Sequence, residues 1–174
     1  MSETPLDARL ETLFAKQEIY EVLMRYCRGV DRMDEALVRS CYHPDAIDEH
    51  GSFKGGVGEY IAFVWKLMPR YDVTMHFIGN VLIEPELASN VARSEAYCIA
   101  HHRQDGGPPA SNLATGCRYI DRFERRGGGA WLIAKRIVTT EWIRHDIPEV
   151  QFPIKETLRT GQRDRSDPVY EPIS

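Results

Sequence analysis

The chain has 174 residues, a formal net charge of −4, 43% hydrophobic residues and 28% charged residues. This length and balance are typical of one globular domain, and the scattered lysines and arginines argue against binding to nucleic acid or to an anionic membrane surface. No apolar run approaches the roughly 20 residues of a membrane helix and the first residues do not resemble a signal peptide, so we expect a cytoplasmic protein.

The first 70 residues carry mostly helical patterns. Apolar residues recur at steps of three, four or seven over residues 6–30, which predicts a helix whose core-facing stripe is Leu6, Leu10, Leu13, Tyr20, Met24 and Cys27. Gly29 suits the end of this helix, and Asp34 can cap a short second helix running to about residue 42. Residues 43–45 (His-Pro-Asp) indicate a turn, residues 46–50 a short strand, residues 51–58 a glycine-rich turn and residues 59–68 a third helix.

The pattern changes after residue 70. Four segments rich in β-branched and aromatic residues, at 73–84, 91–103, 113–125 and 131–144, are separated by turn-forming residues. Helices followed by strands with short links predict an α+β fold with an antiparallel sheet and the helices on one face. We expect residues 1–145 to form this single domain. Residues 146–174, rich in proline and charge, are expected to pack on its surface or on a neighbouring subunit.

The four cysteines, Cys27, Cys41, Cys98 and Cys117, lie far apart and show no C-x-x-C spacing. In a chain without an export signal this pattern is typical of reduced, mostly buried thiols and gives little support to thiolate metal ligation.

Asp31 falls four residues after Cys27 and so continues the predicted buried face of the first helix. A carboxylate is costly on such a face, and at a helix C-terminus, unless it is paired or hydrogen-bonded. Asp31 could instead cap the next helix. His76 lies inside an apolar strand, where it is either a core histidine or a site residue. A carboxylate bonded to one ring nitrogen would leave the other free to take a proton, so the two residues together suggest an acid–base pair.

Several of these segments resemble one family. The run QEIYEVLMRYCRGVD at residues 17–31, Phe53-Lys-Gly before a helix, His76 in a strand leading to Asn80, and WLIAK at residues 131–135 are similar to SnoaL-like proteins of the nuclear transport factor two-like superfamily. The resemblance covers roughly residues 10–144. It implies a cone (a cystatin-like α+β barrel) made of a curved, mostly antiparallel sheet, with three N-terminal helices packed on it around a closed pocket.

The same segments resemble scytalone dehydratase and hexachlorocyclohexane dehydrochlorinase, in which an aspartate ending the first helix orients a histidine base. The resemblance implies that His76 and Asp31 are catalytic. Together with strand alternation it implies pocket positions for Tyr26, Asp48, His50, Tyr97, Ile99, His101 and Ile137, with Arg136 facing the other way. Residues 48–50 could alternatively form an exposed edge strand. The dehydrochlorinase has apolar residues at the short-strand positions and an arginine in its pocket, so the lining here favours an oxygenated substrate.

Three functions follow as hypotheses. The first is a cofactor-independent lyase or isomerase, dehydratase-like, that takes a carbon-bound proton from a small, cyclic, oxygenated substrate. The second is polyketide cyclase-type aldol chemistry, and the third is a non-catalytic binding module such as the small subunit of an aromatic-ring dioxygenase. Asp48, His50 and His101 formally make a metal-ligand set, but no dedicated spacing supports it and we expect neither metal nor cofactor. The resemblance also implies a homo-oligomer, a dimer or a trimer.

Overall fold

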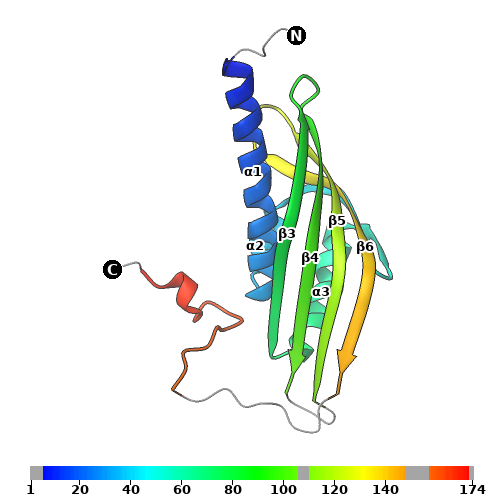
Figure 1. The fold of residues 1–174 in the computed structure, drawn as a ribbon, viewed down its shortest axis with the longest axis vertical. Helices are drawn as coiled ribbons and strands as arrows, with labels where there is room; N and C mark the ends of the chain where they lie inside the picture. Colours follow the sequence, from blue (N-terminus) through cyan, green and yellow to red (C-terminus); the bar gives the residue numbers. More distant parts are fainter. Residues whose placement is uncertain (1–5, 106–109, 148–156, 173–174) are drawn as a thin grey trace.

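The computed structural model of the chain describes residues 6–105, 110–147 and 157–172 (Figure 1). The helices within these ranges are α1 (Leu6–Asp31), α2 (Glu35–Arg39) and α3 (Val57–Leu67), with single 3₁₀ turns η1 (Met68–Arg70) and η2 (Pro168–Tyr170). The strands are β1 (Tyr42–His50), β2 (Phe53–Gly56), β3 (Val73–Glu86), β4 (Val91–Gln104), β5 (Ser111–Arg125) and β6 (Trp131–Asp146). No helix in these ranges is long and apolar enough to cross a membrane.

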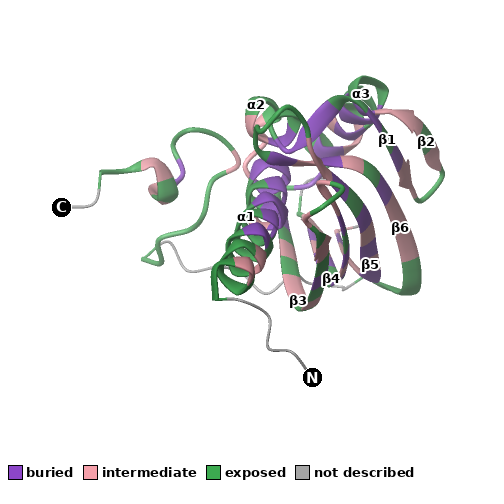
Figure 2. Ribbon diagram, turned by 90° about the horizontal axis from the view of Figure 1, so that it is seen from above, coloured by how far each residue is buried: buried purple, intermediate pink, exposed green. Residues whose placement is uncertain are grey.

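One curved sheet carries the fold, with strand order β2-β1-β6-β5-β4-β3. Neighbouring strands are antiparallel except β1 and β6, which run parallel. The long helix α1 lies along one face beside β3 (Figure 1), and α3 packs at the end of the sheet formed by β1 and β2 (Figure 2). Figure 2 shows the buried residues on the inner side of α1 and along the strands that it covers. The predicted α+β fold, a curved and mostly antiparallel sheet with three helices packed on it, is confirmed.

The predicted core stripe of α1 is wrong over its first half. Leu6, Leu10, Leu13 and Tyr20 are 67%, 40%, 60% and 40% exposed. The buried face begins later and consists of Ala15, Ile19, Val22, Leu23, Tyr26, Cys27 and Val30. The apolar residues of the first turns belong to a neighbouring face, and only Cys27 of the predicted stripe is fully buried. The extrapolation by four residues from Cys27 to Asp31 holds because Cys27 lies on the true inner face.

The turn between α1 and α2 fixes the end of α1. Met33 has a positive φ of 50°, and the backbone N–H of Asp34 donates to the carbonyl of Gly29 at 2.8 Å. The Asp34 carboxylate caps α2 by accepting from the N–H of Leu37 at 3.1 Å, as predicted. Gly29 lies inside α1, where a Cβ would come within 2.7 Å of Val38, so a glycine lets the two helices approach closely.

Residues 43–45, predicted to form a turn, lie inside β1. The register between β1 and β6 shifts between Tyr42, which pairs with Ile133, and Ile47, which pairs with Lys135. This irregular stretch accommodates Pro44 because a proline cannot donate to a regular strand ladder. The predicted glycine-rich turn after β1 contains the short strand β2, which forms a hairpin with β1.

All four cysteines are free and buried, in agreement with the sequence prediction. The described part of the C-terminal segment, residues 157–172, lies against the turn after α1. Arg32 forms an ion pair with the buried Asp167 at 3.0 Å, and Arg165 pairs with Asp34 at 2.8 Å.

Candidate functional site

Asp31 and His76 meet on the inner side of the sheet. Nδ1 of His76 lies 2.7 Å from Oδ1 of Asp31, and the backbone N–H of His76 donates to Oδ2 at 3.0 Å. The side chain of His76 is only 7% exposed and that of Asp31 only 12%. The two bonds engage both oxygens of the carboxylate and direct the Nδ1 proton of the ring toward Asp31. Nε2 points away from the carboxylate and makes no hydrogen bond among the described residues, so it is the atom able to accept a proton.

The fold brings these residues together across 45 positions of sequence. α1 runs antiparallel to β3 and ends where β3 begins (Figure 1). The last residue of the helix therefore faces the first half of the strand. Asp31 lies on the inner face of α1 beyond Cys27, and His76 alternates with the exposed Met75 and Phe77, so both side chains point into the same interior.

The pKa values of two histidines in this region, His76 and His102, are shifted in opposite directions. Burial alone lowers the pKa of His76, but the hydrogen bond and the negative charge of Asp31 outweigh burial and raise the pKa above its ordinary value of 6.5. The neighbouring His102 ring lies edge-on to His76, with the ring centroids 5.5 Å apart. Burial, and then the positive charge of His76, lower the pKa of His102 to about 3, so His102 stays neutral when His76 titrates.

An NMR titration of the histidine rings should resolve this difference. We expect His76 to titrate above 6.5 and His102 to remain neutral throughout the same range. Because the pKa of His76 is raised in the folded state, its contribution to stability is full below the unfolded pKa and is lost as pH rises through the folded pKa. Asp31→Asn should move the His76 midpoint down, and an unchanged midpoint would contradict the role given to Asp31.

A second buried charge pair lies further inside the cone. Arg136 of β6 is 0% exposed and donates to Asp121 of β5 through Nε and Nη2, at 2.8 and 2.7 Å. Its guanidinium carbon lies 4.1 Å from the ring centroid of Tyr26 and 4.3 Å from that of Tyr119. The sequence interpretation placed Arg136 on the outer face, which is wrong. The register shift between β5 and β6 turns this residue inward opposite Asp121.

Tyr26, Asp48 and His50 point inward, as expected. The Tyr26 hydroxyl hydrogen-bonds to the hydroxyl of Tyr60. Asp48 is 0% exposed and accepts from the hydroxyl of Tyr42 at 2.8 Å. The His50 ring stacks on Tyr60 with centroids 5.2 Å apart. These contacts rule out the alternative of an exposed edge strand for Asp48.

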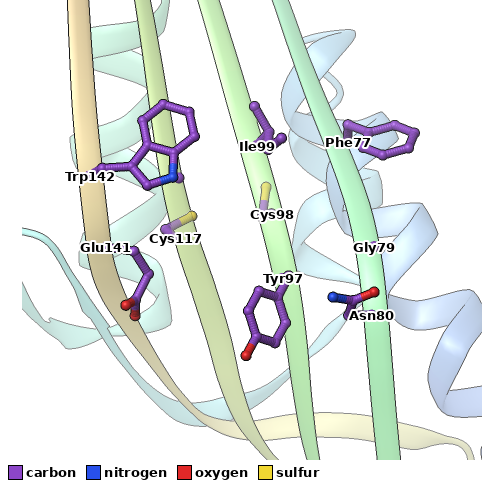
Figure 3. A pocket seen from close by; sticks show the side chains of 10 residues that line it. Phe77, Gly79, Asn80, Tyr97, Cys98, Ile99, Cys117, Glu141 and Trp142 are labelled. Carbon is purple, nitrogen blue, oxygen red and sulfur yellow. The ribbon is translucent and has the colours of Figure 1, made fainter.

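Tyr97, Ile99 and His101 do not share the interior with His76. Tyr97 and Ile99 are 46% and 48% exposed, and both line a hollow of about 490 Å³ on the outer face of the sheet, together with Trp142 (Figure 3). His101 shares their face and pairs with the exposed Met75 of β3. The expectation that these three line the catalytic pocket is wrong. Side chains alternate along β4, and the set that faces inward is the other one, which includes Cys98, Ala100 and His102.

Small side chains set the phase of β4. Its buried residues include Ala92, Ser94, Ala96, Cys98 and Ala100. Small residues let a helix pack closely on a curved sheet, while the larger side chains point outward. The same alternation turns His102 inward, a site residue that the sequence interpretation missed. The run of alternating small residues before His102 was the signal that could have found it.

Ile137 is also placed on the outer face. It lines a shallow hollow with Arg93 and Lys135, side chains of the outer surface. This is the counterpart of the inward orientation of Arg136, since successive strand residues alternate. The possible metal set of Asp48, His50 and His101 does not converge either, because His101 lies on the opposite face of the sheet from the other two.

A family profile described as SnoaL-like domain matches residues 11–137. The chain belongs to the SnoaL-like family. This match confirms the resemblance found in the sequence and the assignment to the nuclear transport factor two-like superfamily. No curated protein sequence matches the chain.

Several solved structures share this SnoaL-like fold at low sequence identity. A putative scytalone dehydratase from Novosphingobium aromaticivorans aligns with a TM-score of 0.65 and 16% identity, over 86% of this chain and 97% of that one. A hexachlorocyclohexane dehydrochlorinase, LinA-type3 from Novosphingobium barchaimii, aligns with a TM-score of 0.67 and 19% identity, over 84% and 97% of the two chains. The Kfla4162 protein from Kribbella flavida aligns with a TM-score of 0.67 and 18% identity, over 76% of this chain and 95% of that one. At these identities the alignments show the fold alone.

Proposed function

We propose that this SnoaL-like domain is a cofactor-independent lyase or isomerase in which His76 removes a carbon-bound proton from a small, cyclic, oxygenated substrate. The observation that carries the proposal is the buried pair itself, with Nδ1 of His76 at 2.7 Å from Asp31 and Nε2 without a hydrogen-bond partner in the described chain. The likeness to a putative scytalone dehydratase and to a hexachlorocyclohexane dehydrochlorinase supports it because base-promoted elimination begins with such a proton transfer.

The chemistry assigns one role to each residue. Nε2 of His76 accepts the proton from a carbon next to an electron-withdrawing group. Asp31 holds the ring with Nδ1 as the donor and stabilises the imidazolium that forms. In elimination, the electron pair left on carbon then expels a leaving group. In isomerisation, the resulting enolate is protonated at a different carbon. In aldol closure, it attacks a carbonyl carbon. The buried Arg136 is neutralised by Asp121, so the proposal gives it a structural role.

Proton removal can be tested before the substrate is known. The protein is incubated in D₂O with a panel of small cyclic ketones and hydroxyketones, and deuterium uptake beside the carbonyl is followed by mass spectrometry. We expect uptake with the unmodified protein and background uptake with His76→Ala. His101→Ala is the matched control because that ring lies on the outer face, and it should retain full uptake.

Equal uptake by His76→Ala and the unmodified protein would refute the role of His76 as the base. Uptake by neither protein on any panel member would favour the non-catalytic binding module. Elimination and aldol closure share this first step and are separated only by the products formed.

We also retain the proposal of a homo-oligomer. Phe77, Tyr97, Ile99 and Trp142 expose large apolar side chains on the outer face of the sheet, at 64%, 46%, 48% and 47%. A second copy of this chain would bury them. Trp142 lies directly over Gly116, where a Cβ would come within 2.2 Å of the indole, so this outer surface is shaped to let the indole lie flat on the strand.

A further inference from the structure

Arg163 of the C-terminal segment is a partly buried cation, and three of its five N–H donors are unused. Its Nη1 donates to the carbonyl of Met68 at 2.9 Å and also to the carbonyl of Tyr71. Nε and Nη2 are buried and make no hydrogen bond among the described residues, and the guanidinium has no carboxylate within ion-pair distance there. Arg136, which is fully buried, is neutralised by Asp121 in a bidentate pair. Arg163 therefore feels the negative charges of Asp31 and Asp72 from a distance but has no carboxylate bonded to it among the described residues.

Two more unpaired polar atoms lie in the same neighbourhood. Oγ1 of Thr74 and Nδ1 of His102 are buried without a partner in the described chain, and these two residues face each other across β3 and β4. Thr74 is 3% and His102 is 7% exposed. The His102 ring lies 4.7 Å from that of Tyr71, whose carbonyl binds Arg163. On its other side His102 meets His76, with centroids 5.5 Å apart.

These atoms share one chemical property. The hydroxyl of Thr74, the neutral imidazole of His102 and the guanidinium of Arg163 can all donate hydrogen bonds. Both oxygens of Asp31, the nearby carboxylate, are already bonded to His76. Burying several donor atoms without partners is costly, and one anionic oxygen group could satisfy them together.

We propose that Arg163, with His102 and Thr74, forms a subsite for an anionic oxygen group of the substrate, a carboxylate or an enolate, beside the proton-accepting His76. The subsite stands on its own geometry, and its place in catalysis rests on the function proposed above. The substrate class becomes a small cyclic acid or a ketone that ionises as its proton leaves. Negative charge developing beside His76 would then be stabilised by a fixed cation.

The C-terminal segment brings Arg163 to this place through contacts with the turn that follows Asp31. Asp167 accepts from the backbone N–H of Gln162 at 2.7 Å and pairs with Arg32. Arg32 is the residue after Asp31. Docking of the segment and placement of the acid–base pair therefore depend on the same turn of the chain.

Benzoate and its neutral isostere benzamide test the subsite directly. Binding of each is titrated through the NMR signals of the His76 and His102 rings, in the unmodified protein, in Arg163→Gln and in the control Arg159→Gln. Arg159 belongs to the same segment but pairs only with the exposed Glu171 among the described residues. We expect benzoate to bind more tightly than benzamide, and Arg163→Gln to weaken benzoate by about tenfold or more while leaving benzamide unchanged. Arg159→Gln should change neither.

Three outcomes would overturn the subsite. These are no saturable binding of benzoate, equal affinities for benzoate and benzamide, or an equal loss of both in Arg163→Gln. The last result would assign Arg163 to holding the segment in place. Benzoate has no proton that His76 would remove, so failure here leaves the proposed proton abstraction standing, and failure of deuterium uptake leaves the subsite standing.

Discussion

Asp31→Asn is expected to lower the rate of proton abstraction by about a hundredfold or more while the protein remains folded. An asparagine oxygen can still accept from the backbone N–H of His76, so the contact between α1 and β3 is retained. The amide carries no charge, so it cannot stabilise the imidazolium. Its NH₂ group can also donate to Nδ1, which favours the ring tautomer whose Nε2 already carries a proton.

The rate is measured as deuterium uptake, and folding is checked by circular dichroism and thermal unfolding. Asp34→Asn is the matched control because Asp34 lies three residues further on, caps α2 and can be replaced by another good capping residue. We expect the control to retain nearly the full rate. A rate for Asp31→Asn that equals the control would remove Asp31 from the mechanism.

Arg136→Ala is expected to give the largest loss of stability, with the free energy of unfolding reduced by about 3–5 kcal/mol. The substitution leaves Asp121, which is 1% exposed, without its counter-charge. It also removes the group that packs against the rings of Tyr26 and Tyr119. Denaturant unfolding followed by fluorescence measures the loss.

Arg118→Ala offers a control from the same sheet. Arg118 pairs with Glu95 and Glu141 on the outer face, where solvent screens the charges. The free energy of unfolding should therefore fall much less in Arg118→Ala than in Arg136→Ala. Replacing both members of the inner pair by apolar residues, as in Arg136→Met with Asp121→Leu, should recover part of the stability because no charge is left buried alone. If Arg136→Ala destabilised the protein no more than Arg118→Ala, the inner pair would have no special structural role.

Much of the fold could be predicted because its signals are local. The four long strands were found to within a few residues, since turn-forming residues separate them clearly, whereas the short β2 was predicted as a turn and missed. The turn predicted at residues 43–45 was wrong because the proline lies in an irregular part of β1, where pairing with β6 shifts register. Propensity alone cannot reveal a partner strand that tolerates such a shift.

The site was predictable only in part. The meeting of Asp31 and His76 came from helical spacing together with a family resemblance, and both lie on the core side of their elements. Strand phase was the weak point, because alternation groups residues into two sets without saying which set faces inward. The wrong set was chosen for β4: Tyr97, Ile99 and His101 were predicted to face inward, whereas Cys98, Ala100 and His102 do so.

Arg136 and Arg163 could not be found from sequence for different reasons. Arg136 is turned inward by an irregularity between β5 and β6 that no sequence pattern marks, and its partner Asp121 lies 15 residues away. Arg163 belongs to a charged segment that follows the sheet, where the sequence shows only surface character, yet its guanidinium binds the carbonyls of Met68 and Tyr71. A resemblance that ends near residue 144 is silent on this segment.

The pH dependence of deuterium uptake shows whether His76 is the base. The base must be the neutral imidazole, so the rate should rise with pH through the pKa of His76, which Asp31 holds above 6.5, and the kinetic midpoint should equal the NMR midpoint of that ring. His76→Ala should abolish the pH-dependent uptake. Uptake that persists in His76→Ala, or whose kinetic midpoint does not follow the titration of the His76 ring, would show that His76 is not the base.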